Sequence, residues 1–322
     1  MKWGRLRVTC RLPNQIIMPE IALIKTSSMG DVIHNLPVAS DILEHYPNAT
    51  LDWVVEEAFA SIPAMHPGIS KVIPVAVRRW RKSPLNSRHE FGAFRENLKL
   101  KKYDLIIDTQ GLLKSALIAR LAIGTRCGYD RISAREPVAS FFYDRTFHVE
   151  KNLHAVTRNR MLAAACLGYQ LDNPLDYGLR LTTETQDYAV LLHATSRKEK
   201  LWDESNWVEL GNRLGMKSFL PWGSAEERAR SERIASKIPG SEVPPALSLS
   251  DAAQLVAGAS VVFGVDTGLS HLAAALSVPV IGIYCATDPG LTGIFSAGSG
   301  INIGGKNDPP SVEEALHAWR SL

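Results

Sequence analysis

Short apolar runs alternate along the chain with segments whose apolar residues recur at helical spacing. The apolar runs predict strands at 21–24, 51–55, 71–75, 105–108, 126–128, 189–193, 218–221, 261–265 and 280–284. The periodic segments predict helices at 32–46, 91–101, 114–122, 204–214, 226–238, 249–257 and 268–275, with a short capped helix in the tail at 311–322. Alternation of this kind indicates βαβ units and parallel sheets.

A polar stretch at 173–186 interrupts this alternation. A chain of 322 residues suits two domains better than one. We therefore predict an α/β protein with two Rossmann-like, doubly wound domains at 18–172 and 187–322, joined by the polar stretch as a linker. Residues 1–17 carry four basic side chains but lack the apolar centre of a signal peptide, and we expect them to be a poorly ordered extension.

The bulk composition is that of an ordinary globular protein, with 45% hydrophobic and 21% charged residues. A net charge of +3 is small for a nucleic-acid-binding protein, which normally has a wide basic footprint. The four cysteines form no CxxC pair, which argues against a zinc site or a disulfide framework and fits a reducing compartment. No apolar run is long enough to cross a bilayer.

The stretch 25–31, Lys-Thr-Ser-Ser-Met-Gly-Asp, leads from the first predicted strand into a helix. Ligands bind at this end of the strands in open α/β sheets. A carboxylate is out of place in a turn that only binds phosphate, but it suits a group that takes a proton from a substrate hydroxyl. Asp31 is therefore a candidate general base. The alternative is that Asp31 only stabilises the first turn of the helix.

Two segments of the second half follow predicted strands with polar residues. Thr195, Ser196 and Lys200 offer hydroxyls and an ammonium group to phosphate oxygens, or else form a plain solvated loop. Further on, Glu226 lies where a carboxylate can accept hydrogen bonds from a ribose diol. Acidic residues also favour a helix start, so this second assignment has an equally simple structural explanation.

A third segment, 266–271, is the strongest candidate for a binding site. Asp266 ends a buried strand, and Thr267 and Gly268 open a helix whose free N–H groups and positive dipole end suit a phosphate. His271 falls one turn later, either at the same site or as a packing residue. No GxGxxG, Walker lysine or DxD motif accompanies these segments, and the turn at 287–290 is interpreted as a simple Pro-Gly turn.

A basic strip follows the third predicted strand. Its charged members are Arg78, Arg79, Arg81 and Lys82, with Trp80 among them. Because the run contains no balancing acids, we expect it to attract an anionic partner, whether nucleic acid, an anionic lipid surface or a phosphorylated substrate. Trp80 would then stack on a base or lie at a membrane interface. Arg135 adds to the positive charge of the same half.

Seven motifs occur in order and together point to one family. They are KTSSMGD at 25–31, RRWRK at 78–82, DTQGLLKS at 108–115, AREP at 134–137, LHATS at 192–196, LPWG at 220–223 and DTGLSH at 266–271. With them the chain resembles the lipopolysaccharide heptosyltransferases of glycosyltransferase family 9 from about Glu20 to its end. This resemblance implies a GT-B fold, in which two Rossmann-like domains face each other across a cleft.

The resemblance also implies an activity and its partners. The donor would be ADP-heptose, and L-glycero-D-manno-heptose would pass with inversion to the first Kdo of the lipopolysaccharide inner core. The acceptor would be Kdo–lipid A, an anionic glycolipid, so the protein would be cytoplasmic and would contact the anionic inner-membrane surface peripherally. The resemblance implies no metal and no cofactor, and the narrow basic footprint argues against nucleic acid.

By position in the motifs, the resemblance assigns roles to single residues. Asp31 would be the general base. The donor would be held by Thr195, Ser196 and Lys200 at the diphosphate, Glu226 or its neighbour Glu227 at the ribose, Leu247 at the adenine, Asp266 at the heptose, and Thr267, Gly268 and His271 nearby. The acceptor would meet Arg78, Arg79, Arg81, Lys82 and Arg135.

Two alternatives remain open at the level of sequence. The chain would otherwise be another core heptosyltransferase of the same family, or a non-catalytic protein that binds a nucleotide sugar or an anionic lipid. Retention of Asp31 argues against the pure binder, because binding a diphosphate has no use for that carboxylate.

Overall fold

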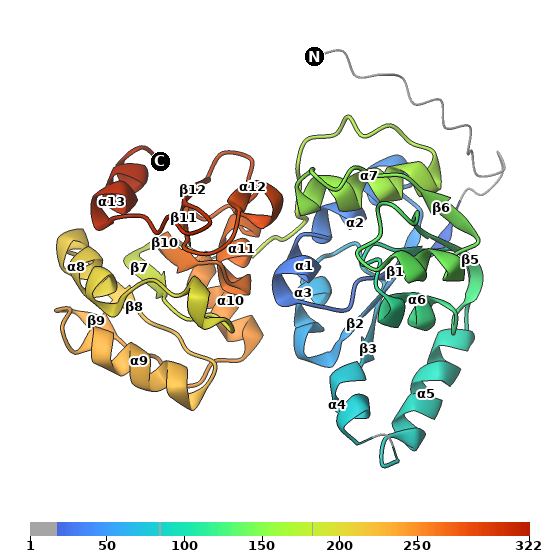
Figure 1. The fold of residues 1–322 in the computed structure, drawn as a ribbon, viewed down its shortest axis with the longest axis horizontal. Helices are drawn as coiled ribbons and strands as arrows, with labels where there is room; N and C mark the ends of the chain where they lie inside the picture. Colours follow the sequence, from blue (N-terminus) through green and yellow to red (C-terminus); the bar gives the residue numbers. More distant parts are fainter. Residues whose placement is uncertain (1–17, 84, 182) are drawn as a thin grey trace. The chain divides into compact units, whose positions relative to one another are not determined.

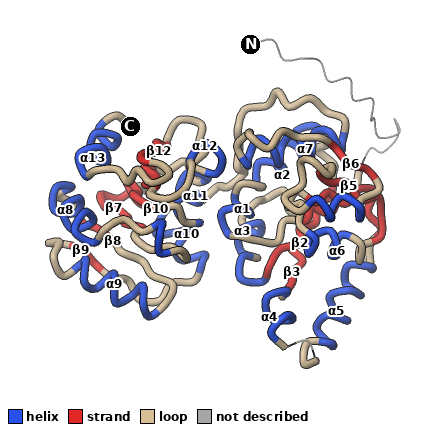
Figure 2. The backbone as a smooth tube through the Cα atoms, in the orientation of Figure 1, coloured by secondary structure: helices blue, strands red, loops and turns tan. Residues whose placement is uncertain are grey.

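The computed structural model describes residues 18–83, 85–181 and 183–322, so the predicted extension at 1–17 lies outside the described residues. The chain forms two compact units, one reaching to Gly178 and the other starting at Leu179. The boundary between them falls within the polar stretch 173–186. Each unit contains one six-stranded sheet in which all paired strands are parallel (Figures 1 and 2).

The sheet of the first unit has the order β3-β2-β1-β4-β5-β6. Its strands are β1 (Glu20–Ile24), β2 (Thr50–Glu56), β3 (Lys71–Val75), β4 (Lys102–Asp108), β5 (Ile123–Tyr129) and β6 (Arg145–Phe147). The central strand β1 pairs Ile24 with Val54 of β2 and with Asp108 of β4. All of β1 from Ile21 to Ile24 is fully buried, as expected for a strand that is covered on both faces.

The helices of the first unit alternate with these strands along the chain, and the last of them follows β6. They are α1 (Met29–Ile33), α2 (Leu36–His45), α3 (Ser61–Ala64), α4 (Val77–Lys82), α5 (Arg88–Lys99), α6 (Leu113–Ala119) and α7 (Ala155–Leu167), with 3₁₀ turns η1 (Glu57–Phe59) and η2 (Pro137–Phe142). The prediction of a single helix at 32–46 was wrong, because α1 and α2 are separate helices. Pro37 lies in the first turn of α2, where its fixed φ and missing N–H start a helix rather than continue one.

The second unit repeats this architecture with the order β12-β11-β10-β7-β8-β9. Its strands are β7 (Gln186–Leu192), β8 (Lys217–Phe219), β9 (Ser241–Glu242), β10 (Ala259–Val265), β11 (Val280–Tyr284) and β12 (Gly300–Gly304). Its helices are η3 (Lys198–Lys200), α8 (Glu204–Leu214), α9 (Ala225–Ala235), α10 (Leu249–Ala257), α11 (Gly268–Ala275), α12 (Pro289–Thr292) and α13 (Val312–Arg320). The prediction of two Rossmann-like α/β units is confirmed.

Both sheets share one topological feature that positions a site. In each sheet the first and fourth strands of the unit are neighbours, β1 with β4 and β7 with β10. The connections leave these two strands toward opposite sides, so a crevice opens beyond their carboxyl ends. The turn 25–31 follows β1, and the segments at 195 and 266 follow β7 and β10. The three candidate segments with the strongest chemistry therefore lie at the two switch points.

Candidate functional sites

The turn after β1 is bonded tightly to the segment after β4. The Nζ atom of Lys25 donates to the carbonyl oxygen of Thr109 at 2.9 Å. The backbone N–H and the hydroxyl of Thr26 both donate to Oε1 of Gln110 at 2.7 Å. Gln110 in turn donates through Nε2 to the carbonyl oxygen of Ser27 at 2.5 Å. These bonds fix the backbone that leads into α1.

Asp31 lies in the first turn of α1, as predicted. Its Oδ2 atom accepts hydrogen bonds from the backbone N–H of Ser28 at 2.9 Å and from the Ser28 hydroxyl at 3.0 Å, and the first of these bonds is one half of a capping box. The structural role that the sequence left open is therefore real. It uses Oδ2 only, and Oδ1 accepts no hydrogen bond from the described residues. With a side chain that is 23% exposed, Asp31 can cap the helix and still present an oxygen to a ligand.

Two cations lower the pKa of the Asp31 carboxylate. Burial by itself would raise its pKa, but the charges of Lys25 and then Arg135, together with the Ser28 hydrogen bonds, outweigh burial and lower the pKa below its ordinary value. Arg135 approaches Oδ2 to 3.6 Å with its Nη1 atom and is itself 57% exposed. The structure thus brings together Asp31 and Arg135, which the sequence had placed 104 positions apart in two motifs.

The basic strip forms helix α4, which the sequence analysis missed. The expectation that it has no balancing acids was wrong for Arg79, which forms ion pairs with Glu57 at 3.0 Å and Glu90 at 2.8 Å. Trp80 is not free to stack on a base or enter a membrane interface. Its Nε1 donates to Glu90 at 3.0 Å, and its ring packs against the ring of Phe94, 5.4 Å between centroids. Glu90 lies on α5, so these bonds join α4 to α5.

The other members of the strip remain exposed. Arg78, Arg81 and Lys82 all lie on the surface of α4. The backbone N–H of Arg78 donates to the buried carboxylate of Glu56 at 3.0 Å, and its guanidinium lies 5.5 Å from the centre of the Phe59 ring. The described residues form no ion pair with Arg81 or Lys82. Three of the four predicted members can therefore still meet an anion.

The candidate donor residues of the second unit converge on Asp266, directly after β10. The Nζ atom of Lys200, at the end of η3, lies 2.6 Å from Oδ2 of Asp266. The hydroxyl of Thr195, in the loop after β7, donates to the Asp266 carbonyl oxygen at 3.0 Å. Lys200 and Asp266 are 16% and 11% exposed, so the pair is largely shielded from water. The loop after β7 and the end of β10 thus form one site.

Two further side chains complete the Asp266 cluster. The hydroxyl of Thr287, in the loop after β11, donates to Oδ2 of Asp266 at 2.7 Å, and Nε2 of His271 lies 3.7 Å from Oδ1. Burial would raise the Asp266 pKa, but His271, Lys200 and Thr287 hold it far below its ordinary value. Sequence reasoning missed Thr287 because the turn at 287–290 was interpreted as a simple Pro-Gly turn. The available signal was a hydroxyl three residues after a strand that neighbours β10.

Thr267 and Gly268 lie where the sequence placed them, at the start of α11. Thr267 is the N-cap residue, and its side chain makes no capping hydrogen bond. Gly268 is the first helical residue, so the first turn of α11 offers backbone N–H groups beside the Asp266 cluster. This arrangement suits an anionic oxygen atom.

The remaining donor candidates lie at the same end of the second sheet without touching the Asp266 cluster. Ser196 is exposed in the loop after β7, and Leu247 is half-buried just before α10. In the first turn of α9, Glu227 accepts a hydrogen bond from the backbone N–H of Gly223 at 2.7 Å, whereas Glu226 is exposed. Of these two carboxylates, Glu226 is the freer to accept hydrogen bonds from a ribose.

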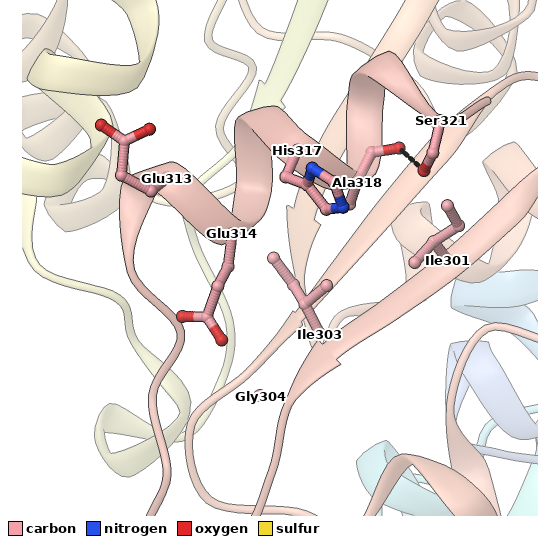
Figure 3. A pocket seen from close by; sticks show the side chains of 8 residues that line it. All are labelled: Ile301, Ile303, Gly304, Glu313, Glu314, His317, Ala318 and Ser321. Atoms are coloured by element: carbon pink, nitrogen blue, oxygen red, sulfur yellow. Dashed lines mark hydrogen bonds between the residues drawn. The ribbon is translucent and has the colours of Figure 1, made fainter.

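A cavity of about 430 Å³ lies elsewhere in the second unit (Figure 3). It is bounded by β12 and α13, and its lining residues are Ile301, Ile303, Gly304, Glu313, Glu314, His317, Ala318 and Ser321. Its two carboxylates have partners already. Glu313 pairs with Arg213, and Glu314 accepts from Ser311 in the capping box of α13. None of the candidate site residues borders this cavity.

Over 18–83, 85–181 and 183–322, no group of three His, Cys, Asp or Glu side chains is arranged to hold a metal ion. None of the helices in that part of the chain is both long and apolar enough to cross a membrane.

Two Rossmann-like units, each with polar residues gathered at its switch point, define a protein of the GT-B class. Residues 91–316 match Glycosyltransferase family 9 (heptosyltransferase). The chain therefore belongs to glycosyltransferase family 9, the heptosyltransferases.

Individual relatives agree with this assignment. The chain is 48% identical over 286 residues to lipopolysaccharide heptosyltransferase 1 of Escherichia coli K12, which covers 85% of this chain and 90% of the relative. It is 47% identical over 287 residues to the protein of the same name from Pseudomonas aeruginosa, covering 85% and 81%. Among solved structures, E. coli heptosyltransferase WaaC with ADP matches with a TM-score of 0.89 and 43% identity, over 94% of this chain and 99% of that one. WaaC with ADP-2-deoxy-2-fluoro heptose matches with a TM-score of 0.86.

Proposed function

We propose that this protein transfers L-glycero-D-manno-heptose from ADP-heptose to the first Kdo of the lipopolysaccharide inner core, with inversion at the anomeric carbon. The observation that carries the proposal is the Asp31 carboxylate, which is ionised, partly exposed and left with one free oxygen at the switch point of its sheet. The similarity to a heptosyltransferase solved with ADP and with a fluorinated ADP-heptose supports the choice of donor.

In the proposed reaction Asp31 takes the proton from the acceptor hydroxyl as that oxygen attacks the anomeric carbon. The new C–O bond forms while the bond to the diphosphate oxygen breaks, and ADP leaves with the electron pair. Attack from the face opposite the leaving group inverts the anomeric centre. A carboxylate with a pKa below its ordinary value is ionised at neutral pH and ready to act.

The leaving diphosphate gains negative charge in the transition state, and the second unit carries groups that meet it. Lys200 would stabilise this charge, helped by the hydroxyls of Thr195 and Ser196 and by the N–H groups that open α11 at Gly268. The ion pair with Asp266 supports this role, because it holds the Lys200 ammonium at the switch point before any donor arrives. Only one of the three ammonium protons is needed for Asp266, which leaves the others for phosphate oxygens.

Contacts to the other parts of the donor are proposed from the positions of residues in the family motifs. Asp266 would accept hydrogen bonds from the heptose hydroxyls, with Thr267 and His271 beside it. Glu226 would take the ribose, and Leu247 would give the adenine an apolar contact. Exposure of Glu226 and the half-buried state of Leu247 are compatible with these roles.

The acceptor is proposed to be Kdo–lipid A, an anionic glycolipid. Arg78, Arg81, Lys82 and Arg135 would attract it, and the same charges would favour peripheral contact with the cytoplasmic face of the inner membrane. We assign Arg79 a different role, because its ion pairs join α4 to η1 and to α5 and thus hold the strip in shape.

Release of ADP tests the function directly. Purified protein with ADP-heptose and Kdo–lipid A should release ADP and form a product of inverted anomeric configuration, which NMR of the product establishes. An acceptor that already carries the first heptose should be inactive, and activity on it alone would identify another core heptosyltransferase. Binding of both ligands without ADP release would identify a non-catalytic binder.

We expect the protein to keep full transferase activity when EDTA is added. A loss of activity that Mg²⁺ restores would overturn the metal-free mechanism.

Removing the exposed charges of α4 should weaken acceptor binding selectively. We expect the Arg78→Ser, Arg81→Ser, Lys82→Ser triple variant to raise the acceptor KM and to bind anionic vesicles less tightly at low salt. Each basic residue near an anionic surface contributes about 1 kcal/mol, so three together correspond to roughly a hundredfold. The donor Kd should stay unchanged.

A matched control keeps the total charge loss equal. Lys237, Lys306 and Arg320 are exposed basic residues of the second unit, outside every candidate site. Their triple replacement by Ser should leave acceptor kinetics unaltered. Equal acceptor KM values for both triple variants and the parent, across salt concentrations, would mean that the α4 residues only keep a surface helix soluble.

A further inference from the structure

Lys25 is a buried cation to which none of the described residues offers a direct anionic partner. Lys25 is the first residue after β1 and is only 5% exposed. Its Nζ atom donates to two neutral oxygens, the carbonyl of Thr109 at 2.9 Å and Oδ1 of Asn159 at 3.3 Å. Within the described residues it takes part in no ion pair. Lysines are almost never fully buried unless paired, because removing a charge from water is costly.

Burial destabilises the charged form of this side chain. It lowers the pKa of Lys25 to about 8, with Asp31 as the largest influence in the opposite direction. A Met or Leu at this position would fill the space beside β1 without that cost. The charge therefore calls for an explanation other than stability of the fold.

Asn159 fixes the position of the ammonium group. It lies on α7 and is 3% exposed. Its Oδ1 accepts from Lys25 and, at 3.2 Å, from the hydroxyl of Tyr129, while its Nδ2 donates to the carbonyl oxygen of His34 at 3.3 Å. All its contacts agree on one orientation of the amide, with the oxygen toward Lys25. The His34 carbonyl belongs to the residue that ends α1, so this network also touches the helix that carries Asp31.

Several charged groups surround the Lys25 ammonium. Lys25 interacts electrostatically with Asp31, Arg135, Asp108 and Arg158. Asp31 interacts in the same way with Lys25 and Arg135, and its charge also acts on Lys114 and on the buried hydroxyl of Tyr129. Asp108 is already engaged, because Oδ1 accepts from the N–H of Gln110 at 2.8 Å and Oδ2 from the hydroxyl of Tyr143 at 2.7 Å. Asp31 is thus the carboxylate with an oxygen left for chemistry.

We propose that Lys25 is a positioning residue of the transfer reaction, whose buried charge, held in place by Asn159, keeps Asp31 in the ionised form that a general base requires. Lys25 touches neither substrate in this proposal and acts only through Asp31. The inference rests on the proposed function, since it presupposes that Asp31 is the base.

The sharpest test is Asn159→Asp, which changes one amide to a carboxylate of the same shape. The new carboxylate would pair with Lys25 and cancel its charge. Lys25→Met removes the charge outright. Tyr129→Phe is the matched control, because it removes a hydrogen bond from the same Asn159 oxygen and leaves every charge of the site unchanged at neutral pH.

We expect the acid limb of the kcat/KM profile to move to higher pH by about one unit or more in Asn159→Asp and Lys25→Met, and to stay in place in Tyr129→Phe. On the acid side this shift corresponds to at least about a tenfold loss, whereas at pH 8 all three variants should approach the parent. The KM for ADP-heptose should not change. Melting temperatures identify a variant that fails to fold, and Asn159→Asp keeps the proposal testable if Lys25→Met does.

Two outcomes would contradict the role of Lys25, and a different one would contradict the proposed function. If Asn159→Asp and Lys25→Met lower kcat equally at every pH, Lys25 is a structural residue and the inference is wrong. An unmoved acid limb in folded variants also overturns it. Failure of the proposed function would appear elsewhere, as an Asp31→Asn variant that turns over normally at all pH values.

Discussion

Replacing Asp31 by Asn is expected to lower kcat by at least about a hundredfold, the usual scale for loss of a general base. The amide has nearly the same shape as the carboxylate but cannot accept the acceptor's proton at neutral pH. Its oxygen can still accept from the Ser28 N–H, which currently donates to Asp31 Oδ2 at 2.9 Å. The helix cap therefore survives in large part, and the effect should fall on turnover rather than on folding.

The measurements that check this are kcat with Kdo–lipid A and the Kd for ADP-heptose. The donor Kd should stay within about twofold, because the donor residues belong to the second unit. Ser28→Ala is the matched control, since it removes the hydroxyl that donates to Asp31 Oδ2 and retains the carboxylate. It should cost some stability and keep most of the turnover. Near-normal kcat in Asp31→Asn would show that Asp31 serves only as a cap.

Replacing Lys200 by Ala is expected to lower kcat and kcat/KM together, by about 10²- to 10³-fold. The charge that Lys200 meets grows as the diphosphate leaves, so its loss is felt most in the transition state. The ion pair adds a second consequence. Without Lys200, Asp266 keeps Thr287 and His271 as partners, and its pKa should move back toward its ordinary value.

Lys198→Ala provides the control for this variant. Lys198 lies in the same 3₁₀ turn and is exposed, whereas Lys200 is bonded to Asp266. Its removal changes the net charge equally and should leave kcat close to that of the parent. A rise in the donor KM with unchanged kcat in Lys200→Ala would assign Lys200 to ground-state binding alone.

Local signals were sufficient to predict many elements. The bounds of β3, α8, α10 and α11 agree with the sequence predictions residue by residue. Each combines a periodic or continuous apolar pattern with a clear start, such as Ser248 at the N-cap of α10. These signals depend on neighbours within a few positions, so the sequence contains them directly.

Helix α7 shows where such signals fail. Its buried face includes Asn159 and Arg160, two polar residues that interrupt the apolar pattern. They are buried because distant partners satisfy them, Lys25 for the amide and Asp41 for the guanidinium, which lies 2.7 Å from that carboxylate. A periodicity that counts apolar positions cannot detect a helix whose inner face is completed by partners more than 100 residues away.

The sequence by itself determined which residues follow each strand, and hence that Asp31 and Asp266 lie at strand ends that open into helices. Only the tertiary structure decided which of these strand ends are neighbours. The strand orders bring β1 beside β4 and β7 beside β10, and this creates the contacts of Lys25 with Thr109 and of Lys200 with Asp266. Long-range pairs depend on sheet order and register, which no local pattern encodes. For the same reason, only the folded chain shows that Glu57 and Glu90 form ion pairs with Arg79. It alone also shows that the Thr287 hydroxyl donates to Asp266.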